Sequence, residues 1–133
     1  MDKNTELRQW LEIADSDLTA AKYLSQYMQP ISYEIICFHC QQAAEKYLKW
    51  FLVLNDIDPP KIHDLDELLR LCEEIHPNFK SINKICITLS EYAVHTRYPD
   101  EKKLLKTDME IAMEYAKDIR DFLSEQFPQD FII

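Results

Sequence analysis

Glycine is absent from all 133 residues of the chain. Loops that cradle phosphates, and the fingerprints that bind dinucleotides, need glycine where the backbone turns tightly or approaches a ligand. Tight two-residue hairpins also depend on glycine. The sequence therefore excludes a Walker-type or Rossmann-type nucleotide site. Because Leu, Ala, Glu and Lys are abundant, it favours helices over sheets.

Positive charge and long apolar runs are also scarce. Lys and Arg total 15 against 24 Asp and Glu, which gives a net charge of −9. Such a surface repels a phosphate backbone at long range, so we do not expect DNA as a partner and expect RNA only at a local patch. No apolar run approaches the roughly 20 residues of a membrane span, and the first residues lack an apolar signal core. We therefore expect a cytoplasmic protein without a membrane partner.

Four cysteines are present, and two of them form a CxxC motif at Cys37 and Cys40. With two further ligands this motif could bind zinc, but no second Cys or His pair lies nearby in sequence. The motif also falls inside a predicted apolar helix face. We interpret the thiols as reduced, buried and structural, and we expect neither a metal nor another cofactor.

Hydrophobic spacing predicts an all-α protein: a single domain over residues 1–133, folded as an up-and-down bundle of about five helices. The second helix has apolar residues on more than one face, so we expect it to be long and central. The expected helices begin near Asn4 or Thr5, run from about Tyr33 to Asn55, from about Asp64 to Ile75 and from about Phe79 to Val94, and begin again at Thr107.

Short polar residues predict how these helices begin and end. Ser32 follows a proline and is expected to cap the second helix. Asn55 is expected to end that helix in the left-handed conformation, because the chain has no glycine for this position. Thr107 is expected to cap the last helix within a capping box.

Polar residues interrupt the apolar surface of the predicted second helix, among them Gln41, Glu45 and Lys49. One interpretation is a solvated face, on which Glu45 and Lys49 form a weak surface pair. The other is a polar cleft or a dimer seam, where buried polar groups must find partners.

Three other candidates lie together where the fourth predicted helix ends. His95, Arg97 and Tyr98 bring an imidazole, a guanidinium and a phenol to one corner, which suits binding of a phosphate. In the structural alternative, Arg97 pairs with a carboxylate such as Glu45, or bonds the last carbonyls of its helix, and Tyr98 packs as a plug. His63, at the start of the third helix, is either a cap-region residue or a general base.

Three motifs together resemble the HEPN family. Residues 38–49 are similar to the signature of the central HEPN helix. His63-Asp64-Leu65 and Arg97-Tyr98-Pro99-Asp100 stand where the family has its "HDL" and "RYP" motifs. Together with residues 10–24, the resemblance covers nearly the whole chain. It implies a helical bundle that dimerises and is commonly encoded beside a small nucleotidyltransferase, which carries out the nucleotide chemistry.

The resemblance also raises the question of ribonuclease activity. Many HEPN relatives are metal-independent ribonucleases of toxin and defence systems, with an arginine, four to six intervening residues and a histidine at a helix end. Counting back from His95, the arginine positions hold Ser90, Leu89 and Thr88. The tyrosine that the nucleotidyltransferase of some pairs modifies, two residues after the histidine, is replaced by Arg97.

Our hypothesis is therefore a dimeric partner of a minimal nucleotidyltransferase, in a toxin–antitoxin or defence-type pair, with little or no catalysis of its own. A polar cleft for a nucleotide or an RNA end is expected to contain Gln41, Glu45, His63, His95, Arg97 and Tyr98. Two alternatives remain. One is a metal-independent ribonuclease toxin, in which His95 is the general base and Arg97 stabilises the phosphate. The other is a purely structural dimerisation module.

Overall fold

The computed structural model of the chain describes residues 1–95 and 103–132. It contains five α-helices and one 3-10 helix, and no strand within the described residues, which confirms the all-α prediction. The elements are α1 (Lys3–Tyr27), α2 (Tyr33–Leu54), α3 (Leu65–Ile75), η1 (Pro77–Ile82), α4 (Asn83–His95) and α5 (Lys106–Gln126). None of the described helices combines the length and the apolar character of a membrane span.

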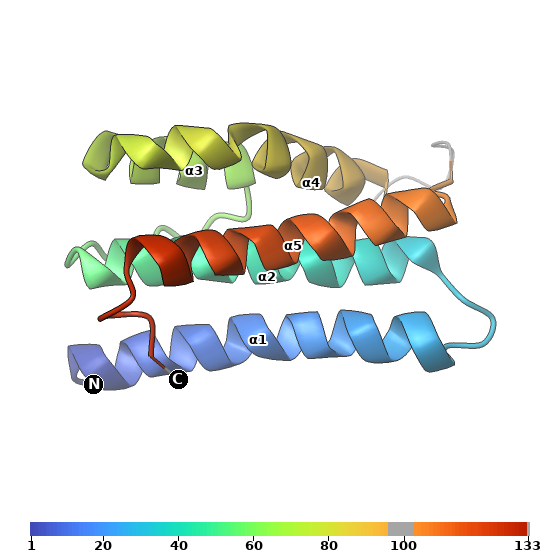
Figure 1. The fold of residues 1–133 in the computed structure, drawn as a ribbon, viewed down its shortest axis with the longest axis horizontal. Helices are drawn as coiled ribbons and strands as arrows, with labels where there is room; N and C mark the ends of the chain where they lie inside the picture. The colour runs from blue at the N-terminus through green and yellow to red at the C-terminus, as the bar shows by residue number, and fades with distance from the viewer. Residues whose placement is uncertain (96–102, 133) are drawn as a thin grey trace.

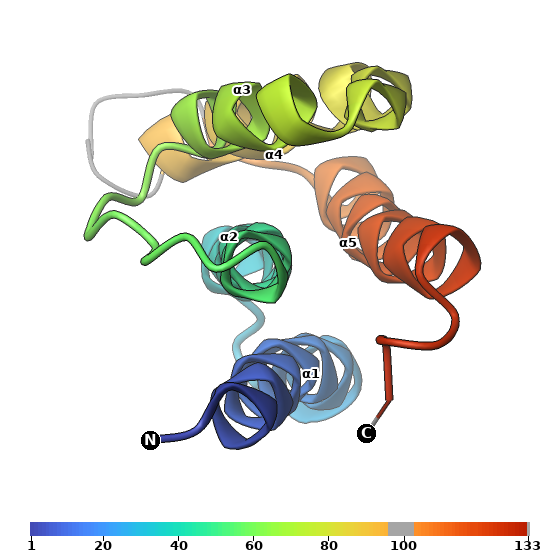
Figure 2. The same cartoon turned by 90° about the vertical axis from the view of Figure 1, so that its left-hand side faces the viewer.

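The helices pack around α2. In Figure 1, α1, α2 and α5 run side by side along the long axis of the molecule, and α3 and α4 form a layer on the side of α2 away from α1. Figure 2 views the bundle end-on, with α2 between α1 and this layer and α5 at its flank. Helix α2 contacts all four of the other α-helices, so most of its circumference is buried. It has 22 residues, fewer than the 25 of α1.

Caps at the first two helices follow the rules for short polar side chains. Ser32 accepts a hydrogen bond from a backbone amide at the start of α2, as predicted. The prediction for α1 was wrong, because the cap is Asp2 and not Asn4 or Thr5. The Asp2 carboxylate accepts a hydrogen bond from the Thr5 amide at 2.9 Å, and a negative charge at a helix N-terminus is itself favourable.

Two other predicted helix ends were also wrong. Asn55 has a φ of −99°, and Asp56 takes the left-handed conformation with a φ of 61°. Aspartate tolerates this region because its short side chain bonds locally. Helix α5 begins before Thr107, with Leu105 at the cap position. There the carboxylate of Asp108 accepts a hydrogen bond from the Leu105 amide at 2.7 Å, which is half of a capping box.

Large aromatic side chains fill the core, and the C-terminal residues extend it. Trp50, Tyr47 and Phe51 of α2 are essentially inaccessible to solvent. After α5 the chain turns back toward α1 (Figure 2). This turn places the ring of Phe131 5.3 Å from that of Trp50, and the ring of Phe127 5.0 Å from that of Phe51. The tail therefore packs on the core through Phe127 and Phe131, whereas Ile132 is 67% exposed.

One polar cluster connects three helices beside this core. The hydroxyl of Tyr47 in α2 donates to the carboxylate of Asp15 in α1. The guanidinium of Arg120 in α5 donates to the same carboxylate at 2.9 Å. Burial, followed by the hydrogen bond to Asp15, raises the pKa of Tyr47. The phenol therefore stays protonated and holds α1, α2 and α5 in register.

Candidate functional site

Three polar residues of α2 form a continuous buried stripe, which we call the α2 polar stripe: Gln41, Glu45 and Lys49. They are four residues apart and so share one face of the helix. Only 4%, 3% and 6% of their surfaces are exposed. The Lys49 ammonium donates to the Glu45 carboxylate at 3.1 Å. The interpretation as a solvated face with a surface pair was therefore wrong, because both charges are buried.

The α2 polar stripe holds the connection that leads into α3. The side-chain amide of Gln41 donates to the backbone carbonyl of His63 at 3.1 Å. The Nδ1 atom of His63 lies 3.0 and 3.2 Å from the two carboxylate oxygens of Glu45. His63 does not cap α3, because the carboxylate of Asp64 accepts from the first amides of that helix. The side chain of His63 is 68% exposed, and its imidazole covers the buried Glu45–Lys49 pair.

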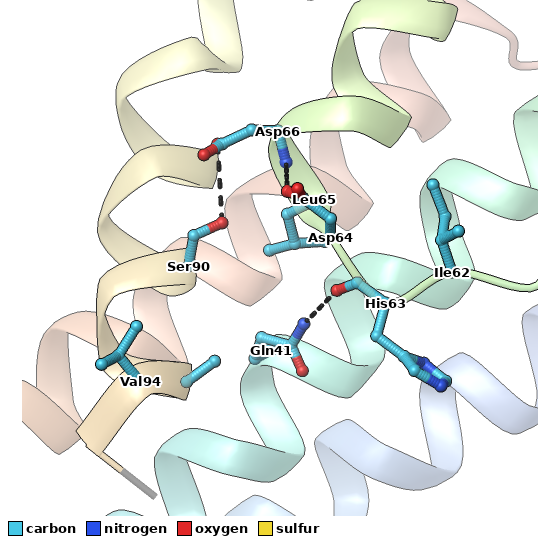
Figure 3. Close-up of a pocket in the computed structure, with 9 residues that line it drawn as sticks. Gln41, Ile62, His63, Asp64, Leu65, Asp66, Ser90 and Val94 are labelled. Carbon is cyan, nitrogen blue, oxygen red and sulfur yellow. Dashed lines mark hydrogen bonds between the residues drawn. The ribbon is translucent and has the colours of Figure 1, made fainter. Parts of the chain in front are cut away.

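Next to this connection lies a pocket of about 530 Å³. It is formed by α2, the start of α3 and the last turns of α4, and we call it the α3–α4 pocket. Its lining residues are Gln41, Ile62, His63, Asp64, Leu65, Asp66, Ser90, Ala93 and Val94. Figure 3 shows that the imidazole of His63 points away from Ser90 and Val94. His63 therefore lines the pocket mainly with its backbone.

The wall of the α3–α4 pocket is acidic. The hydroxyl of Ser90 in α4 donates to the carboxylate of Asp66 in α3 at 3.5 Å (Figure 3). Burial raises the pKa of Asp66, and the neighbouring carboxylates of Asp64 and Glu91 raise it further. None of the described residues that line the pocket is Lys or Arg. This wall suits hydrogen-bond donors and cations and disfavours a phosphate.

The structure brings together part of the predicted site. Gln41 and His63 line one pocket, and Glu45 bonds to His63 from the buried stripe. His95 is the last residue of α4, but its side chain lies outside the described residues, as do Arg97 and Tyr98. Their predicted roles therefore stay predictions.

Sequence reasoning missed Asp66 as a lining residue. An available signal was its position two residues after the α3 cap, Asp64, on a helix whose apolar face must cover α2.

The cysteines have the environment of structural thiols. All four are buried and free. Burial raises the pKa of Cys37, Cys40 and Cys86 to about 12 and also raises that of Cys72. A thiol must lose its proton to bind zinc, and this environment opposes that loss. Within the described residues, no three His, Cys, Asp or Glu side chains converge as a metal site would require.

The buried ion pair of the stripe gives a first prediction. Glu45→Ala leaves the Lys49 ammonium buried without its partner, so we expect the free energy of unfolding to fall by about 3–5 kcal/mol. Replacing both residues by methionine removes both charges and is expected to stay close to the wild type. The measurement is urea unfolding at one fixed protein concentration.

A matched control is the exposed Glu67–Arg70 pair of α3, where Glu67→Ala should cost less than about 1 kcal/mol. If Glu45→Ala and Glu67→Ala lowered the free energy of unfolding equally, the burial of the α2 pair would not contribute to stability.

The thiols give a second prediction, which concerns pH. In the unfolded chain each thiol titrates near its ordinary pKa of 9.0, whereas three of the folded thiols keep their protons up to about pH 12. The contribution of the thiols to the free energy of unfolding is therefore complete below pH 9. It is lost as the pH rises from 9 toward 12, because only the unfolded state releases protons in this range. Urea unfolding between pH 8 and 10 should show this fall. In the Cys37→Ala/Cys40→Ala variant, the free energy of unfolding should fall less steeply with pH. A slope equal to that of the wild type would contradict the raised pKa of these two thiols.

Comparison with known proteins gives the family. The model of the HEPN domain matches residues 7–126, which is most of the chain and includes the α2 polar stripe and the α3–α4 pocket. A search of the curated proteins and a search of the solved structures found no match. At the level of the family, the match supports a function related to nucleotides or RNA. The resemblance noted in the sequence is thereby confirmed, and the chain belongs to the HEPN domain family.

Proposed function

We propose that this protein is a dimeric HEPN partner of a minimal nucleotidyltransferase, in a toxin–antitoxin or defence-type pair, and that it binds a nucleotide or RNA without cleaving it. The family match supports the link to nucleotides or RNA, and the acidic wall of the α3–α4 pocket carries the part of the proposal that excludes cleavage. Within the HEPN match, this pocket adjoins the end of α4, where ribonucleases of the family carry their arginine and histidine.

The contact between Ser90 and Asp66 argues against cleavage of RNA. Ser90 stands where an arginine would lie five residues before His95, and its hydroxyl bonds to the Asp66 carboxylate instead. Metal-independent cleavage needs positive charge near the phosphate as negative charge develops in the transition state. A carboxylate at this position opposes that charge.

The same pocket is suited to a neutral or cationic group. Its volume lies within the ~300–1,000 Å³ that ligand sites commonly have. Apolar residues Ile62, Leu65 and Val94 line it together with Asp64 and Asp66. An exocyclic amino group of a base, or a basic side chain of a partner protein, would donate to these carboxylates.

Exposed apolar side chains support the dimer. Phe38 is 41% exposed and lies one turn before Gln41 on α2, and Val94 is 44% exposed on the rim of the α3–α4 pocket. Ile35 on α2 and Ile87 on α4 are exposed as well, at 44% and 41%. The net charge of −9 further supports attraction of a nucleotidyltransferase with a basic surface.

The test uses the purified chain and the small nucleotidyltransferase that we expect to be encoded beside it. We expect total RNA to remain intact with the wild type. Light scattering should give the mass of a dimer, and the two proteins should elute together. Val94→Glu should abolish the dimer, because it places a charge in the apolar contact.

Ile13→Glu is the matched control. Ile13 is 46% exposed on α1, on a helix that does not line the pocket, so this variant should remain dimeric. RNA cleavage that is lost in His95→Ala or Arg97→Ala would establish the ribonuclease alternative. Failure of the two proteins to associate, together with a monomeric wild type, would reject the proposal.

A further inference from the structure

A second cavity lies on a different side of α2 from the α3–α4 pocket. It has a volume of about 160 Å³ and is lined by residues of α1, α2 and α5, so we call it the α1–α5 slot. Its lining residues are Leu18, Ala21, Lys22, Cys40, Met113 and Lys117. Cys40 and Ala21 are buried and form the floor, whereas Lys22 and Lys117 are exposed at the rim. Within the described residues, neither lysine is in an ion pair.

The charge of the slot contrasts with the charge of two other pockets. The α3–α4 pocket has Asp64 and Asp66 in its wall. A pocket beside the N-terminus is lined by three acidic residues, and its Lys3 ammonium is paired with Asp56 at 3.0 Å. The slot has two lysines and no carboxylate among its lining residues. Of these three pockets, the slot is therefore the one whose lining residues repel an anion least.

Carboxylates of α5 also lie close to Lys117. Glu114 precedes it by three residues and Asp121 follows it by four, so both share its side of the helix. Asp118 follows Lys117 and is turned by about 100° around the helix axis. Burial raises the pKa of Asp118, and Glu114 and Asp121 raise it further, while Lys117 acts in the opposite sense. These carboxylates therefore flank Lys117 and offset part of its positive charge, although none of them lines the slot.

The floor of the slot is suited to an uncharged planar group. The Cys40 thiol is neutral, because burial raises its pKa to about 12. The thioether of Met113 is polarizable and makes favourable contacts with aromatic rings. The slot is also smaller than the ~300–1,000 Å³ of typical ligand pockets, so it suits one ring system better than a long acyl chain. Two ammonium groups at the rim match a doubly charged anion.

We propose that the α1–α5 slot binds a nucleoside monophosphate, with its base against Leu18 and Met113 and its phosphate between Lys22 and Lys117. The ligand is either a free nucleotide or the 5′-phosphorylated end of an RNA. The identification of the ligand as a nucleotide rests on the proposed function, whereas the location of the site does not. Cys40 and Gln41 are consecutive in α2 and face the slot and the α3–α4 pocket respectively, so the two sites can be occupied together.

Methionine methyl groups provide a local readout for this site. The chain has four methionines, of which Met113 lines the slot, Met1 lines the pocket beside the N-terminus and Met28 lines none of the three pockets. We would titrate protein labelled at the methionine methyls with 5′-AMP and follow the NMR signals. The Met113 signal should shift and saturate, while those of Met1 and Met28 should stay in place. Adenosine and inorganic phosphate should each bind more weakly than 5′-AMP.

Charge variants test the rim. Lys22→Gln and Lys117→Gln should each weaken 5′-AMP binding by roughly fivefold at low salt, and the double variant by more. Lys84→Gln is the matched control, because Lys84 is exposed on α4 away from the slot, and it should bind like the wild type. A short RNA with a 5′-phosphate that competes with 5′-AMP, where its 5′-hydroxyl counterpart does not, would identify an RNA end as the source of the ligand.

Two outcomes overturn the inference and are distinguishable from failure of the proposed function. If 5′-AMP stabilises the protein but leaves the Met113 signal and the lysine variants unaffected, a nucleotide binds elsewhere and the slot is not its site. If 5′-AMP does not bind at all, the slot assignment is wrong, while association with the nucleotidyltransferase still decides the proposed function. A saturable Met113 shift that is weakened in the double variant supports the site even when no partner is found.

Discussion

Much of the arrangement around α2 depends on one buried ion pair, between Glu45 and Lys49. Two charges removed from water must be paired and hydrogen-bonded, or they would cost several kcal/mol each. Glu45 meets this requirement through Lys49 and the His63 imidazole, and the Lys49 ammonium also lies 5.9 Å from the centre of the Trp10 ring. The pair therefore ties two other parts of the chain to α2: α1 and the connection before α3.

Two cavities with different charges lie on different sides of α2. On one side, Gln41 holds the backbone of His63 and thereby sets the wall of the α3–α4 pocket, whose carboxylates favour donors. On another side, Cys40 forms the floor of the α1–α5 slot, whose lysines favour an anion. A nucleotide carries both kinds of group, and a chain with net charge −9 separates the places that would accept them.

The sequence predicted the helices well, because a 3.6-residue period and proline breaks are local signals. It also identified the residues of the α2 polar stripe, but not their burial, since a Glu-Lys pair four residues apart looks the same on an exposed helix. The cap at Asp2 was missed because Asn4 and Thr5 have the same short polar chemistry nearby. The slot could not be predicted, because Lys22 and Lys117 come from opposite ends of the chain and meet only when α1 and α5 flank α2.

The most direct test of this account is hydrogen–deuterium exchange of a triple variant, Gln41→Leu/Glu45→Met/Lys49→Met. This variant removes the α2 polar stripe without leaving a buried charge, so the bundle should remain folded. We expect faster exchange in peptides covering residues 55–68, where the stripe holds the connection to α3, and unchanged exchange in α5. Unchanged exchange in residues 55–68 would contradict the claim that the stripe positions this connection and the pocket beside it.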